Sequence, residues 1–307
     1  MRPALDACNM QKGMALVLIV LILLPLGNAD TNTADESRES VGGHAILLEH
    51  YTATWCDTCA TVDPWITEFS NSHSSRMVRV ALHPDDHDPF GSPLTTKRLA
   101  LKQADHSLSL PTFWFDGQGE MEGTVSQTLL ENQLRSAESE RVQWMHMRVL
   151  WDTWHNQTQE DAHQLSIDVN ENLPSNAIIT VFRLETLEMT TEIAYNGIDI
   201  HHDVATQMIS FAPNGTIVDS YDGEQGWSMS EVDLNGGDGA SDFILETTGR
   251  VSGFVTIIEV NGDVRGVIGI SDDDKRPNAE NFDILALLLL LGVLAISANI
   301  SRRDTTH

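Results

Sequence analysis

Cysteine, lysine and aromatic residues are scarce in this chain of 307 residues. Three cysteines are too few for a framework of several structural disulfides. Eighteen basic residues stand against 45 acidic ones, which gives a formal net charge of −27. Because nucleic acid is bound by a cationic surface, this balance argues against nucleic acid as a partner. The chain also shows no repeat of fixed period, and no set of residues that predicts a cofactor or a metal site.

The N-terminal segment carries the features of a secretory signal. An apolar run, Met14–Leu26, follows Arg2 and Lys12 and precedes the small-residue segment Gly27–Ala29. This order predicts a signal peptide over residues 1–29. The alternative is an uncleaved N-terminal anchor, although the run is short for a membrane span.

A second apolar run lies near the C-terminus. Residues 284–300 contain no charge and are followed by Arg302 and Arg303. A helix of this length is just long enough to span a bilayer core, and the arginine pair predicts a cytoplasmic tail at 301–307. The alternative is a buried core helix. With an acidic linker at 273–283, the pattern predicts a single-pass cell-membrane protein, anchored by this helix, whose residues 30–283 are extracytoplasmic.

The pattern between the two ends predicts two folded regions. Residues 44–142 alternate strands and helices and predict an α/β domain. The expected strands are 45–51, 77–82 and 110–115, and the expected helices begin near residue 59, at 95 and at 125.

Beyond this region the pattern changes to short strands. About seven apolar or alternating segments predict a β-sandwich over residues 143–272. Asn261–Gly262 is a strong hairpin signal within it. Residues 30–43 are polar and acidic, and we expect a disordered leader there.

The pair Cys56 and Cys59 is the feature that points to chemistry. It follows an expected strand and opens an expected helix, which places Cys56 at a helix N-terminus. Unpaired backbone N–H groups and the helix dipole favour a thiolate at that position. Cys59, one turn later, can then attack a mixed disulfide and release the substrate. The alternatives are a structural disulfide and half of a zinc site.

The residues around this pair resemble the thioredoxin superfamily. Trp55-Cys56-Asp57-Thr58-Cys59 matches the W-C-x-x-C motif, Pro64 matches a proline in the active-site helix, and Leu110-Pro111-Thr112 matches the superfamily's cis-proline loop. The resemblance implies that Pro111 is cis and lies against the cysteine pair. It also implies that Trp55, Cys56, Cys59 and Pro111 belong to the active site.

The chain departs from this family at several positions. Thioredoxins usually have a buried Asp where this chain has His50, six residues before Cys56. His50 can relay a proton to Cys59, or it can be a core histidine bonded to backbone; both readings stay open. The segment 83–93 contains histidines and aspartates that could bind a metal, but prolines interrupt them, and a solvated loop is the favoured interpretation. With the predicted β region, the chain resembles exported, membrane-anchored thioredoxin-like proteins that carry a C-terminal immunoglobulin-like β domain.

The sequence therefore favours one function and leaves an alternative. The favoured hypothesis is an extracytoplasmic thiol–disulfide oxidoreductase that exchanges disulfides with exported proteins, with Cys56 as nucleophile and Cys59 as resolving thiol. The alternative is a non-enzymatic, membrane-anchored surface binding protein whose disulfide is structural or vestigial. Client proteins, the direction of electron flow and the oligomeric state are not encoded in these patterns.

Overall fold

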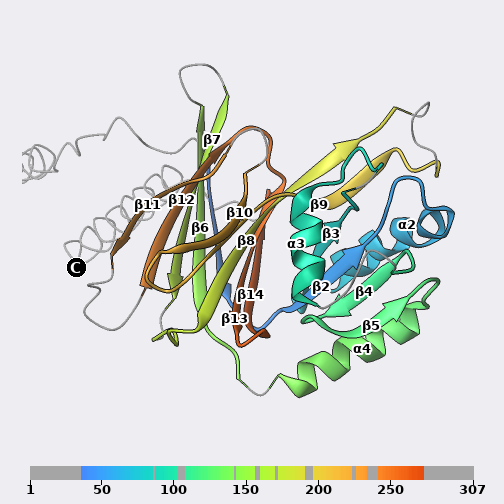
Figure 1. The fold of residues 1–307 in the computed structure, drawn as a ribbon, viewed down its shortest axis with the longest axis horizontal. Helices are drawn as coiled ribbons and strands as arrows, with labels where there is room; N and C mark the ends of the chain where they lie inside the picture. Colours follow the sequence, from blue (N-terminus) through green and yellow to red (C-terminus); the bar gives the residue numbers. More distant parts are fainter. Residues whose placement is uncertain are drawn as a thin grey trace, which may run out of the picture. The chain divides into compact units, whose positions relative to one another are not determined.

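The structure, a computed structural model, describes residues 36–85, 87–102, 108–141, 143–155, 160–169, 172–190, 196–222, 226–233 and 241–272. All of these residues belong to one compact unit, Asp35–His307. Within the described ranges, fourteen strands and three helices are present, and the strands form two sheets (Figure 1).

Strand β2 (Ile46–Tyr51) leads directly to the cysteine pair. It runs parallel to β3 (Met77–Leu82) and antiparallel to β4 (Thr112–Phe115), which pairs with β5 (Gln118–Glu122). All six residues of β2 are buried. Such a continuous buried run suits a strand that is covered on both faces of its sheet.

Three helices cover these strands. Residues of α2 (Asp57–Ser72) and α4 (Gln127–Glu140) share one apolar cluster with Ile46 and Leu48 of β2. Residues of α3 (Pro93–Leu101) share a different cluster with Leu47. Because neighbouring residues of a strand point to opposite faces, α3 lies on the face opposite to α2 and α4.

The same sheet continues into the second half of the chain. Its strand order is β14-β13-β8-β9-β3-β2-β4-β5, with β10 paired to β9. The strands from the second half are β8 (Ala177–Glu188), β9 (Ile200–Phe211), β10 (Ile217–Tyr221), β13 (Gly253–Val260) and β14 (Asp263–Ser271). Parallel pairing of β3 with β9 at Ala81 and Val204 joins the two halves.

The second sheet has five strands in the order β1-β6-β7-β12-β11. They are β1 (Glu36–Gly42), β6 (Met147–His155), β7 (Asp161–Val169), β12 (Ser241–Thr248) and β11 (Ser228–Asp233). Apolar residues of β6, β7 and β12 pack against those of β8, β9 and β13 to form a large core cluster. Strand β1 occupies residues that the sequence analysis placed in a disordered leader, and that expectation is wrong for 36–42.

The predicted fold class is also wrong. An α/β thioredoxin-like domain followed by a separate immunoglobulin-like sandwich requires that each region complete its own sheet. Instead, the described chain is mostly β, and strands from residues 44–142 and 143–272 share a nine-stranded sheet. Local periodicity located many individual strands, including the hairpin at Asn261–Gly262 between β13 and β14. Local periodicity does not encode the pairing of strands that lie more than 100 residues apart in the chain.

The predicted membrane anchoring and single-pass location are not upheld. Among the described residues, no helix has the length and apolar character that crossing a membrane requires. The membrane as a partner, the cell-membrane location and a transmembrane helix in the fold therefore have no support in the structure. The segments on which these predictions depend, residues 1–29 and 273–307, lie outside the described ranges.

Candidate functional site

Cys56 and Cys59 lie where β2 passes into α2. Cys56 is the N-cap of α2, and the Cys59 backbone N–H donates a hydrogen bond to Cys56 Sγ over 3.1 Å. The two cysteines form a disulfide. Cys56 is 7% exposed and Cys59 is fully buried. An incoming sulfur atom would therefore reach Cys56 before Cys59.

The predicted proline loop lies beside this disulfide. The Leu110–Pro111 peptide bond is cis, which confirms the geometry that the resemblance implied. Leu110 packs against the small apolar cluster of Ala53, Cys56 and Cys59. Trp55 is 44% exposed and forms part of the surface next to Cys56. The structure thus brings four of the five predicted site residues into one neighbourhood.

His50, the fifth predicted site residue, is buried against a carboxylate. Its Nε2 lies 3.4 Å from Asp63 Oδ1, and its ring stacks on Phe113 with 4.6 Å between the ring centroids. Thr52 Oγ1 donates a hydrogen bond to the other oxygen, Asp63 Oδ2, over 2.8 Å. Within the described chain, neither ring nitrogen of His50 has a hydrogen bond of normal geometry. His50 is therefore not the backbone-bonded core histidine that was one of its two readings.

Burial controls the protonation of this pair. It raises the pKa of Asp63 to about 6, although the Thr52 hydrogen bond acts in the opposite direction. Burial, reinforced by the charge of Arg79 and by two neighbouring histidines, holds the pKa of His50 well below its usual range. At neutral pH, His50 is thus uncharged, whereas Asp63 titrates near neutrality.

Asp63 is the residue of this site that the sequence analysis missed. It follows Cys59 by one turn of α2, and both side chains are buried. Side chains at i and i+4 lie on the same face of a helix, and the Cα–Cβ bond of Asp63 is tilted towards the helix N-terminus, where Cys59 lies. A carboxylate four residues after the second cysteine, on the apolar face of the expected helix, was the available signal.

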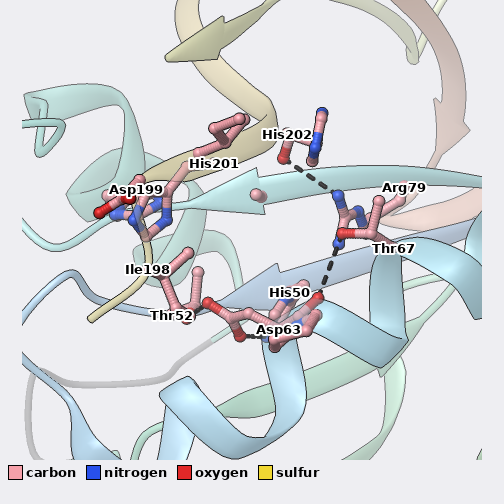
Figure 2. Close-up of a pocket in the computed structure, with 13 residues that line it drawn as sticks. His50, Thr52, Asp63, Thr67, Arg79, Ile198, Asp199, His201 and His202 are labelled. Carbon is pink, nitrogen blue, oxygen red and sulfur yellow. Dashed lines mark hydrogen bonds and ion pairs between the residues drawn. The ribbon is translucent and has the colours of Figure 1, made fainter. Parts of the chain in front are cut away.

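A cavity of about 370 Å³ opens behind His50 and Asp63. Figure 2 shows its walls, which come from β2, α2, β3 and the start of β9. Arg79 from β3 donates hydrogen bonds to Asp203 Oδ2 over 2.8 Å and to the carbonyl oxygen of His202 over 3.1 Å. Its charge is thereby paired with a carboxylate of β9 and is not free to bind an anion.

Two further histidines contribute to this cavity. The rings of His83 and His201 meet edge to face, with 5.3 Å between their centroids. Burial and the neighbouring His83 lower the pKa of His201 to about 4. In the described part of the chain, no group of three or more His, Cys, Asp or Glu side chains is arranged to hold a metal ion.

The segment 83–93 differs from the solvated loop that was expected. His83 and Asp88 are buried, and His83 Nδ1 lies 3.3 Å from Asp88 Oδ1. Burial alone would raise the pKa of Asp88, but His83 and the N–H groups of Thr54 and Phe90 outweigh it and hold this pKa below its ordinary value. Asp88 is therefore an ionised, buried group beside the cysteine loop.

Comparison with known proteins shows likeness only at the level of structure. No protein-family model matches the chain, and no curated protein matches it. The structure of HBP35 of Porphyromonas gingivalis superimposes with a TM-score of 0.55 at 14% identity, covering 78% of each chain. This level of identity indicates a similar fold and carries no statement about function.

Two other solved structures are more distant. The protein AGR_C_4864 of Agrobacterium tumefaciens gives a TM-score of 0.48 at 10% identity, over 76% of this chain and 96% of its own. A putative DsbE of Chlorobium tepidum, described as a thiol:disulfide interchange protein, gives a TM-score of 0.23 at 16% identity, over 35% of this chain and 98% of its own. Both TM-scores lie below 0.5, so neither likeness bears on the fold or the function of this chain.

Proposed function

We propose that this chain is a thiol–disulfide oxidoreductase that works through Cys56 and Cys59. The supporting observation is the position of Cys56 Sγ at the N-terminus of α2, where the Cys59 N–H points at it. A thiolate is stabilised at such a position by the helix dipole and by the hydrogen bond. A stabilised thiolate is a good leaving group, and its ionisation at neutral pH makes it available as a nucleophile.

The difference in burial assigns the two roles. A substrate thiolate attacks the more exposed Cys56 Sγ, the Cys56–Cys59 bond breaks, and Cys59 leaves as a thiolate that takes up a proton. A second substrate thiolate then attacks the substrate sulfur of the mixed disulfide and releases Cys56 as a thiolate. Two electrons pass from the substrate dithiol to the protein. Reduction of a substrate disulfide follows the same steps in reverse.

In this proposal, Asp63 accepts the proton of Cys59 and returns it. Cys59 is fully buried, so its proton must pass to a nearby buried group when the thiol becomes a nucleophile. Asp63 lies one turn away on the same helix face, and its pKa of about 6 allows it to accept and release protons near neutral pH. His50, which is uncharged, packs beside the carboxylate and lines the same cavity.

The test is a trapping experiment on the full chain in a Cys8→Ser background, which leaves only the two site cysteines. Cys59→Ala should accumulate mixed disulfides between Cys56 and a peptide that carries a disulfide, because no resolving thiol remains. Cys56→Ser is the matched control and should accumulate none. Equal amounts of adduct in the two variants would remove Cys56 from the role of nucleophile.

A structural disulfide is the second candidate, and the burial of both cysteines favours it. The reduction potential separates the two. Exchange catalysts have potentials from about −120 to −270 mV, whereas structural disulfides lie below about −300 mV. Equilibration of the full chain in thiol–disulfide buffers of defined potential gives this number. A value below the catalytic range would support the structural role.

A further inference from the structure

The loop that delivers Cys56 to α2 is held from two sides by distant parts of the chain. On the first side, Asp88 Oδ2 accepts hydrogen bonds from the Thr54 backbone N–H over 2.8 Å and from Thr54 Oγ1 over 3.2 Å. The other oxygen of Asp88 accepts a hydrogen bond from the Phe90 N–H over 2.9 Å. The Asp88 carboxylate is therefore held in place by its own loop, and it accepts hydrogen bonds from the cysteine loop at Thr54.

On the second side stands Asn196, which precedes β9. Its backbone N–H donates to the carbonyl oxygen of Thr54 over 3.2 Å, and its Nδ2 donates to the carbonyl oxygen of Ala53 over 3.2 Å. Its side-chain oxygen accepts a hydrogen bond from the Ile198 N–H over 3.1 Å. Two of these groups thus join the segment before β9 to the cysteine loop, and the third fixes the Asn196 side chain within its own segment.

One shared hydrogen-bond acceptor connects Asn196 to the cysteine pair. The Ala53 carbonyl that accepts the Asn196 amide also accepts the backbone N–H of Cys56 over 3.2 Å. This turn sets the position of the Cys56 backbone, and so the distance from its sulfur to the Cys59 N–H. Without the amide donor, the turn keeps its own hydrogen bond and the contacts at Thr54 but loses the one from outside to Ala53, so the sulfur can leave the helix N-terminus more often.

We propose that Asn196 is a positioning residue for the cysteine pair: it holds the Ala53–Cys56 turn so that Cys56 Sγ stays at the N-terminus of α2. This inference rests on the proposed function, since it concerns the reactivity of the same pair. Its consequence is that a residue of the β8–β9 connection, 140 positions away from Cys56, adjusts the ionisation of the attacking thiol. Asn196 touches no reacting atom and acts through the backbone of Ala53.

The experiment measures the ionisation of Cys56 in the reduced full chain, in the Cys8→Ser background, from the rate of alkylation across pH. In Asn196→Ala, the midpoint of this profile should move upward by about half a pH unit. The thiolate fraction below the midpoint then falls about threefold, the result of a weakened charge-assisted hydrogen bond. The reduction potential should shift as well, because the thiolate of the reduced form is less stabilised.

Asn214→Ala is the matched control. Asn214 also accepts an N–H from two residues onward, that of Thr216, but in a turn between β9 and β10 away from the cysteines. Its alkylation profile should coincide with that of the unsubstituted chain. If Asn196→Ala does not fold, Asn196→Ser keeps an oxygen that can accept the Ile198 N–H, while its shorter side chain no longer places a donor at the Ala53 carbonyl oxygen.

An Asn196 variant that folds and has the same alkylation midpoint as Asn214→Ala would overturn the positioning role. That outcome would leave the proposed exchange function standing, because alkylation reports ionisation and not turnover. Failure of the proposed function would show separately, as an absence of trapped mixed disulfide in Cys59→Ala, whatever the alkylation profile of the Asn196 variants.

Discussion

Replacing Asp63 with Asn should stabilise the oxidised protein at neutral pH and leave it little changed in acid. Burial raises the pKa of Asp63 from its ordinary value of 3.8 to about 6. Because the folded state binds this proton more tightly than the unfolded state, ionisation destabilises the fold as the pH rises from about 4 to 6. One pKa unit is equivalent to about 1.4 kcal/mol, so the ionised carboxylate costs the fold about 3 kcal/mol above that range.

The amide that replaces the carboxylate in Asp63→Asn keeps an oxygen for the Thr52 hydroxyl and carries no charge. We therefore expect this substitution to raise the free energy of unfolding by about 2–3 kcal/mol at pH 7.5 and by less than about 0.5 kcal/mol at pH 4. Denaturant unfolding of the oxidised full chain at several pH values measures this difference. Asp222→Asn, at an exposed carboxylate, is the matched control and should show no such pH dependence.

The same substitution should slow the proposed exchange reaction, because in that proposal Cys59 loses its proton acceptor. A stabilised protein with slower exchange is the combined result that the site geometry predicts. A difference in stability that is the same at pH 4 and at pH 7.5 would refute the reasoning, since it would show that Asp63 holds no buried charge at neutral pH. The reasoning would also be refuted if Asp63→Asn lowered the free energy of unfolding at pH 7.5 by more than it does at pH 4.

Three other perturbations test separate parts of the structure. Asp57→Asn should lower the pKa of Cys56 by removing a like charge beside it, and an unchanged alkylation–pH profile would contradict this. Glu49→Gln should cost about 3–5 kcal/mol in unfolding measurements, because buried Arg98 and Lys102 lose their shared carboxylate; a cost below about 1 kcal/mol would show that the network is dispensable. His201→Gln should reduce the loss in free energy of unfolding between about pH 6.5 and 4, because burial keeps His201 neutral in the folded state while the unfolded chain binds its proton. The same loss over this pH range in the variant and in the unsubstituted chain would refute this.

The sequence predicted the cysteine site better than it predicted the fold. Cys56, Cys59 and the cis bond at Pro111 are encoded locally, by short motifs whose spacing fixes their place on a strand and a helix. Trp55 also lies where the motif implied. Their roles in exchange stay a prediction until thiol reactivity is measured.

The parts that the sequence did not predict depend on contacts between distant segments. Asp63 was overlooked because a buried carboxylate on a helix is unusual, and only its partners His50 and Thr52 explain it. Asn196 is an ordinary polar residue in a connection, and nothing near it in the chain points to the cysteines. The shared nine-stranded sheet has the same origin, since pairing of β3 with β9 depends on residues 81 and 204 meeting in space.

The pairing of β3 with β9 has a consequence for any attempt to isolate the cysteine region as a fragment. A chain that ended near residue 142 would leave β3 without its pairing to β9 at Ala81 and Val204, and so as an unpaired sheet edge that other chains can bind. Arg79, whose side chain is 3% exposed, would also lose the carboxylate of Asp203. Such a fragment should self-associate through this edge rather than remain monodisperse, so the cysteine pair is best studied in a chain that still contains β9.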